Sequence, residues 1–96
     1  MKYLIYREAD GAEFPRFFTA PITHVEILKE LQAIRAERRA IAAGFCEFLA
    51  DGTVRTLHRS EGLDLGPRSH DASLLSVYYQ QTLQMAKTLD RPYHPA

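Results

Sequence analysis

Apolar and polar positions divide the chain into two similar halves, each with two short apolar runs followed by a helical pattern. Each pair of runs flanks an Asp-Gly dipeptide, at residues 10–11 and 51–52. Asp-Gly tolerates positive φ and favours two-residue turns between antiparallel strands. The pattern therefore predicts one hairpin from residues 2–7 and 13–18, and a second hairpin around 51–52.

The register of each predicted hairpin follows from a turn made of Asp and Gly alone. In the first hairpin this turn places Tyr6 opposite Pro15 in a non-hydrogen-bonded pair, so the missing N–H of Pro15 would have pointed away from the first strand. We therefore expect residues 13–18 to form an edge strand. In the second hairpin the same turn places Cys46 and His58 on opposite sides of the sheet.

A capping box marks the start of the first helix. The Thr23 hydroxyl can accept a hydrogen bond from a helix N–H, while the Glu26 carboxylate reaches back to the cap. Apolar residues then recur at spacings of three and four, and charged residues follow them. The pattern predicts a helix over residues 24–39, whose last basic residues complement the helix dipole.

A second helix is predicted in the last third of the chain. Ser69 or Asp71 can cap its start, and apolar residues at helical spacing continue to about Leu89. The residue before Pro92 disfavours the helical region, so the helix should end there.

The order of these elements predicts the fold class. Strand, strand, helix, strand, strand, helix (ββαββα) indicates an α+β fold: one antiparallel four-stranded sheet of two hairpins, with two helices packed on one face. The chain has 96 residues, enough for one modest core. We expect a single domain over residues 1–90 and a loose C-terminal tail over 91–96.

Charge and cysteine content indicate which kinds of partner and which cellular compartment to expect. Twelve basic residues balance twelve acidic ones, which argues against a bulk electrostatic polyanion binder. One cysteine cannot form an internal disulfide, and the chain has neither a signal-peptide pattern nor a long apolar run. The expected location is therefore a reducing cytoplasm, with no membrane contact.

Candidate catalytic and metal-binding side chains do not form a recognisable motif. The four histidines and the single cysteine lack the close spacing of a zinc site. Cys46 is expected to be a buried core thiol, since the predicted register separates it from His58. No glycine-rich phosphate loop occurs. We therefore predict no metal, no cofactor and no catalytic residue. A small enzyme using a carboxylate pair is the less favoured alternative.

Both faces of the predicted strands are apolar, which indicates a surface for a partner. Two helices on one face would leave the other face uncovered, and exposed aromatic patches mark contacts. We predict a non-enzymatic protein-interaction module, whose partner is another protein or a second copy of the chain. The expected contact residues are Leu4, Tyr6, Phe17 and Phe45.

Clustered arginines keep a nucleic-acid-binding function open as an alternative. A basic stripe with neighbouring aromatic rings could contact a phosphate backbone and stack on bases. The competing interpretation is that these side chains are solvated or paired with glutamates. The residues concerned are Arg35, Arg38, Arg39, Arg55 and Arg59.

Four stretches resemble small proteins of unassigned function that tailed phages and prophages encode. The stretches are KYLIY, AGFCEF, DGTVR and SEGLDLGPRSHDASLL. The resemblance implies a bacterial cytoplasm and an accessory role, such as that of an inhibitor or adaptor of a host protein. It transfers no functional residue to this chain.

Overall fold

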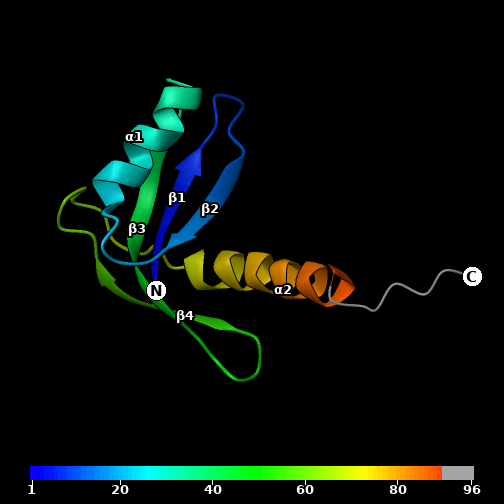
Figure 1. The fold of residues 1–96 in the computed structure, drawn as a ribbon. Helices are drawn as coiled ribbons and strands as arrows, with labels where there is room; N and C mark the ends of the chain where they lie inside the picture. Colours follow the sequence, from blue (N-terminus) through cyan, green and yellow to red (C-terminus); the bar gives the residue numbers. More distant parts are fainter. Residues whose placement is uncertain (90–96) are drawn as a thin grey trace, which may run out of the picture.

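The computed structural model describes residues 1–89 and confirms an α+β fold (Figure 1). The elements are β1 (Lys2–Arg7), β2 (Glu13–Phe18), α1 (His24–Ile34), β3 (Arg39–Phe48), β4 (Val54–Arg59) and α2 (Asp71–Leu89). The strands form one antiparallel sheet in the order β2-β1-β3-β4. The predicted tail over 91–96 lies outside the described residues.

Both hairpin loops contain one more residue than the predicted two-residue turns. In the first, the Glu8 amide donates to the Ala12 carbonyl at 2.8 Å, and Gly11 has a φ of 91°. The Asp10 side chain accepts a hydrogen bond from the Ala12 amide at 2.9 Å, which stabilises the wider loop. The predicted pairing of Tyr6 with Pro15 is therefore wrong, and Tyr6 lies opposite Phe14 instead.

The second hairpin differs from its predicted register in the same way. The Leu49 amide donates to the Thr53 carbonyl at 2.8 Å, and Asp51 accepts from the Thr53 amide at 3.0 Å. Gly52 has a φ of 86°, the left-handed conformation that closes such a loop. Cys46 consequently lies opposite Thr56.

The prediction that Pro15 occupies an edge strand is confirmed. β2 is the outer strand of the sheet, paired with β1 alone. Pro15 lies opposite Ile5, three pairs from the hydrogen-bonded pair Glu8–Ala12. Alternation along an antiparallel ladder makes this a non-hydrogen-bonded pair, so the missing N–H breaks no bond to β1.

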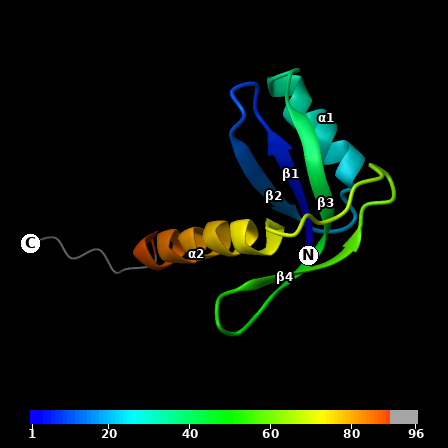
Figure 2. The same cartoon turned by 180° about the vertical axis from the view of Figure 1, so that it is seen from behind.

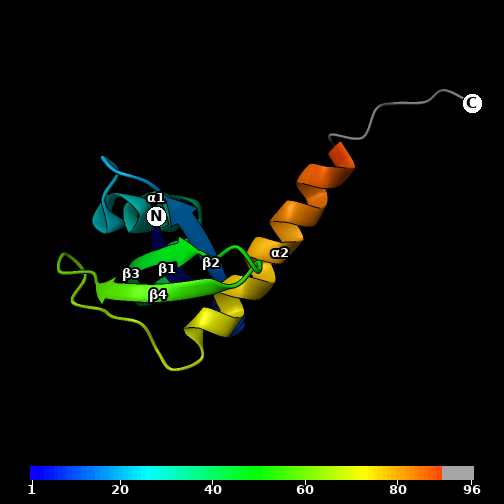
Figure 3. The ribbon, with the colours of Figure 1, turned by 90° about the horizontal axis from the view of Figure 1, so that it is seen from below.

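The two helices pack on opposite faces of the sheet, so the prediction that both cover one face is wrong. On one face Leu4 contacts the α1 residues Ile27 and Leu31. On the other face Ile5 belongs to the core cluster that includes Leu75 of α2. Figure 3 shows α1 on one side of the sheet and the first turns of α2 on the other. Neighbouring strand residues point to opposite faces, so both apolar faces are partly covered.

The first helix is shorter than predicted. α1 begins after Thr23, whose side chain accepts from the Glu26 amide at 3.1 Å, and it ends at Ile34 rather than Arg39. Arg35 already has an extended backbone, and Arg39 is the first residue of β3. The residues at the start of β3 pair with β1 instead of extending the helix.

A β-bulge brings β3 and β4 unusually close at Gly44. The pairing shifts between Gly44–Arg59 and Phe45–Leu57, which leaves His58 as the extra residue with a φ of 45°. A Cβ atom on Gly44 would lie 2.5 Å from the His58 carbonyl oxygen. Glycine is therefore required here by the close approach of two backbones.

Candidate interaction surface

The N-terminus of α2 is fixed to the sheet by a partly buried ion-pair network. Asp71 is fully buried, and its carboxylate accepts from the Arg68 amide at 2.7 Å and from the Arg68 Nε at 2.9 Å. Arg68 also donates to Glu13 of β2 at 2.8 Å. Hydrogen bonds from Arg68 and Arg7 lower the pKa of Glu13 to about 2. This network connects the start of α2 to β2.

The first half of α2 packs against the sheet. Leu75 is fully buried, and the Tyr79 ring stacks on Phe48 with centroids 4.2 Å apart and planes 15° apart. The Tyr78 ring contacts Phe14 edge-on at 6.4 Å. These contacts account for the stable attachment of the first turns, because buried aromatic rings contribute large apolar area.

The second half of α2 extends away from the sheet (Figure 1, Figure 2). Residues 81–86 are all exposed. Leu75, Tyr78, Thr82 and Met85 are spaced by three, four and three residues, so they form one stripe along the helix. Leu75 is fully buried at one end of this stripe, whereas Met85 is 66% exposed at the other. The stripe therefore continues along α2 beyond the part of the helix that packs on the sheet.

The exposed residues 81–86 of this helix carry no charged side chain. No Asp, Glu, Lys or Arg occurs in the 15 residues from 72 to 86, the longest such stretch in the chain. Leu83 is 38% exposed and flanks the stripe. We call Thr82, Leu83, Met85 and Ala86 the outer α2 surface.

The predicted contact residues Leu4, Tyr6 and Phe17 do not form a shared exposed surface. Leu4 is fully buried beneath α1. Tyr6 is half-buried on the same face, with the Arg38 guanidinium 5.1 Å from its ring centroid. Phe17 lies on the α2 face, 5.4 Å from the Phe48 ring. The corrected register separates Tyr6 from Phe17 across the sheet, so their predicted joint surface is wrong.

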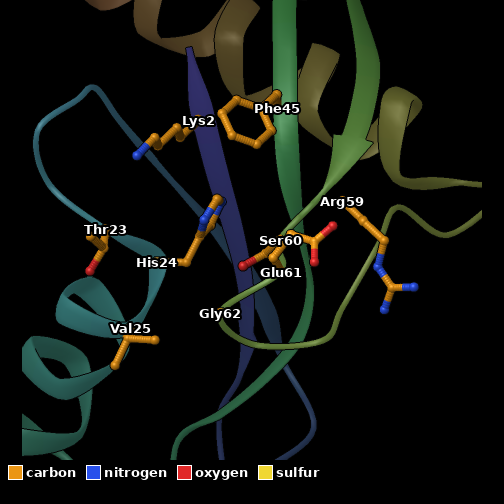
Figure 4. Close-up of a pocket in the computed structure, with 9 residues that line it drawn as sticks. All are labelled: Lys2, Thr23, His24, Val25, Phe45, Arg59, Ser60, Glu61 and Gly62. Atoms are coloured by element: carbon orange, nitrogen blue, oxygen red, sulfur yellow. The ribbon is translucent and has the colours of Figure 1, made fainter.

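Phe45, the remaining predicted contact residue, lines a pocket of about 260 Å³ (Figure 4). The pocket is lined by Lys2, Thr23, His24, Val25, Phe45, Arg59, Ser60, Glu61 and Gly62. The Phe45 ring contacts the His24 ring at 5.7 Å and the His58 ring at 6.2 Å. Its half-buried side chain is therefore part of an aromatic wall.

The polar groups of this pocket are held by the protein itself. His24 is 7% exposed, and its Nε2 lies 2.9 Å from the Gly44 carbonyl, so this nitrogen donates. Lys2 donates to the Ile22 carbonyl at 2.9 Å, and Arg59 pairs with Asp64. Figure 4 shows the Arg59 side chain pointing away from His24. The arrangement favours a structural role for these residues.

The arginines considered for nucleic-acid binding do not gather into one patch. Arg39 begins β3, whereas Arg55 of β4 lies opposite Glu47 near the other end of that strand. Eight residues of extended strand separate these positions by about 26 Å. Two of the five charges are also paired, since Arg55 contacts Glu47 and the Arg38 Nε lies 2.7 Å from the Glu8 carboxylate.

Two further arginines of this set are paired as well. Arg35 lies 3.5 Å from Glu8, and Arg59 contacts Asp64. Charge neutralisation by neighbouring carboxylates reduces the attraction that these residues would exert on phosphate.

The predicted core position of Cys46 is confirmed. Cys46 is 3% exposed in the core on the α2 face, and burial raises the pKa of its thiol to about 11. Its neighbour Phe45 points to the other face, where it contacts His58. The predicted separation of Cys46 from His58 therefore holds in the structure.

Comparisons with known proteins identify no family. No protein-family model matches the chain, and no solved structure matches it. The chain is 27% identical over 66 residues to the calcium-binding mitochondrial carrier protein SCaMC-2-B of Danio rerio. That match covers 69% of this chain but 14% of the carrier, so the chain spans about one seventh of the carrier's length. The resemblance to phage proteins stays a prediction.

Two further observations concern membranes and metals. Among residues 1–89, no helix is long and apolar enough to cross a lipid bilayer. Within the same range, no three side chains of His, Cys, Asp or Glu are grouped so that they could hold a metal ion.

The outer α2 surface is the site that the sequence patterns did not identify. Gln80, Gln81 and Gln84 indicate a solvated helix face, and periodicity alone places Met85 with the core. The available signal is the absence of charge from 72 to 86, because solvated helices normally carry charged side chains.

Proposed function

We propose that the chain is a non-enzymatic protein-interaction module that binds a protein through the outer α2 surface. The observation that carries this proposal is the stripe on α2, which begins at the buried Leu75 and ends at the exposed Met85. A partner that packs on the exposed end of this stripe would make contacts of the kind that the sheet makes with the first turns of α2.

The composition of α2 supports binding rather than simple solvation. At the chain's charged fraction of 25%, 15 residues would carry about four charged side chains, whereas residues 72–86 carry none. Interface cores are depleted of charge and enriched in aromatic residues and Met. Leu83 and Met85 are then the anchors of the contact, because they are large apolar side chains that are exposed.

The test replaces both anchors with lysine. Leu83→Lys with Met85→Lys introduces charge near the helix C-terminus, where cations interact favourably with the helix dipole. Because both side chains are exposed, we expect an unchanged thermal transition and loss of the captured protein when the immobilised chain is incubated with a lysate of its source cells.

Ile34→Lys is the matched control. Ile34 is the last residue of α1 and is 71% exposed, so the same change is made at another helix end. Binding should persist in this control. Capture of the same proteins by the double variant and the unmodified chain would contradict the proposed function.

A further inference from the structure

We infer that the protein bound by the outer α2 surface is a second copy of this chain, paired through antiparallel α2 helices. This inference rests on the proposed function and names its partner.

The first argument is chemical. Between residues 72 and 86 every polar side chain is an amide or a hydroxyl, groups that both donate and accept hydrogen bonds.

A two-fold contact brings the same surface of each copy together, so the surface must be complementary to itself. A charged surface would meet charge of its own sign and be repelled. The outer α2 surface has no charge to repel a copy, and it also has none to attract an oppositely charged partner. Its neutrality therefore favours self-pairing over binding to an acidic or basic protein.

The direction of α2 allows such pairing. The helix leaves the sheet and extends past it, so the outer half of one copy can lie along the outer half of another (Figure 1, Figure 3). With the two-fold axis near Thr82, Met85 of each copy lies close to Tyr79 of the other. Both residues are large, and thioether–aromatic contacts are favourable. Tyr79 is half-buried and retains surface for this contact.

The size of the contact sets its strength. α2 has 19 residues, so it is about 28 Å long. A helix about 10 Å wide covers a footprint on the order of 300 Å² at most, below the roughly 800 Å² per partner of a standard interface. We therefore expect a weak dimer whose population rises with protein concentration.

Sedimentation velocity over a concentration series tests the inference. The sedimentation coefficient of the unmodified chain should rise with concentration from the monomer value toward the dimer value. Met85→Lys should weaken self-association by at least about tenfold, because burial of two like charges opposes pairing. Ile34→Lys should behave as the unmodified chain, since Ile34 lies on α1 at the other face of the sheet.

Disulfide trapping tests the antiparallel geometry. Thr82→Cys places a thiol near the proposed axis, so oxidation should link two copies faster than it links an Ile34→Cys control. The native Cys46 is buried and does not compete. Equal rates of cross-linking for the two cysteine variants would overturn the proposed pairing.

The outcomes separate the inference from the proposed function. A chain that remains monomeric at every concentration refutes the second copy as partner. If Leu83→Lys with Met85→Lys then abolishes capture of a different protein, the proposed function stands without the dimer. If that double variant captures the same proteins as the unmodified chain, both proposals fail.

Discussion

Replacement of Gly44 by alanine should destabilise the sheet where its strands approach most closely. The new Cβ would lie 2.5 Å from the His58 carbonyl oxygen, 3.2 Å from the Leu57 carbonyl oxygen and 3.3 Å from the Tyr3 hydroxyl. Two of these three atoms belong to the backbone, so no side-chain rotation relieves the overlap. The Gly44 carbonyl also accepts the hydrogen bond of the buried His24.

The magnitude follows from the movement that the new methyl group requires. Ordinary van der Waals contact begins at 3.4 Å, so the His58 carbonyl must retreat by 3.4 − 2.5 = 0.9 Å. Overpacking of this kind typically costs 1–3 kcal/mol, and each disturbed hydrogen bond adds about 1 kcal/mol. We expect Gly44→Ala to lower the free energy of unfolding by about 3 kcal/mol, a large part of the 5–15 kcal/mol typical of a domain.

Urea unfolding followed by circular dichroism measures this loss. Thermal unfolding should show a midpoint lowered by roughly 12 °C or more, at 4–8 °C per kcal/mol for a domain of this size. Gly62→Ala is the control, because its Cβ would meet a movable side-chain methyl of Val25 at 3.3 Å. A Gly44→Ala variant within about 0.5 kcal/mol of the unmodified chain would refute the requirement for glycine at the bulge.

Three further predictions concern ion pairs and the thiol. Arg38→Met should cost about 2 kcal/mol in urea unfolding, because it removes a partner 2.7 Å from the 10% exposed Glu8 carboxylate. Glu13→Gln should cost about 1 kcal/mol at neutral pH after allowance for solvent screening. Because folding lowers the Glu13 pKa to about 2, the stability difference between Glu13→Gln and the unmodified chain should be full above about pH 5 and disappear as pH falls toward 2. Iodoacetamide should modify native Cys46 far more slowly than the unfolded chain, because burial raises its thiol pKa; rapid modification of the folded protein would contradict this.

Local sequence signals predicted the elements of this fold well and the hairpin registers poorly. The capping box at Thr23 matches the structure, because it depends on neighbouring residues. The register depends on whether Asp-Gly closes a two-residue or a three-residue loop. Both geometries accept glycine at positive φ, and the side chains of Asp10 and Asp51 stabilise the wider loop by bonding two residues ahead.

The length of α1 could not be predicted from helix propensity. Arg38 is a good helix former, yet it pairs with Glu8 at the first hairpin and donates to the Leu31 carbonyl at 3.2 Å. The same carbonyl also accepts the Arg35 amide at 3.1 Å, so Arg38 adds a second hydrogen bond to the last turn of the helix. The pairing of β3 with β1 therefore outweighs the helix propensity of the residues after Ile34.

The sequence predicted correctly that both faces of the strands are apolar, but it did not predict what covers the second face. Surplus apolar surface on the second face suggested a partner protein, whereas α2 covers that face through Leu75 and Tyr79. A sheet with a helix on each face has little apolar surface left for a partner. Among the apolar residues that remain exposed, Leu83 and Met85 lie farther along α2, where the helix passes beyond the sheet. An interaction surface in this protein is therefore to be sought on the helix that covers the sheet, rather than on the sheet itself.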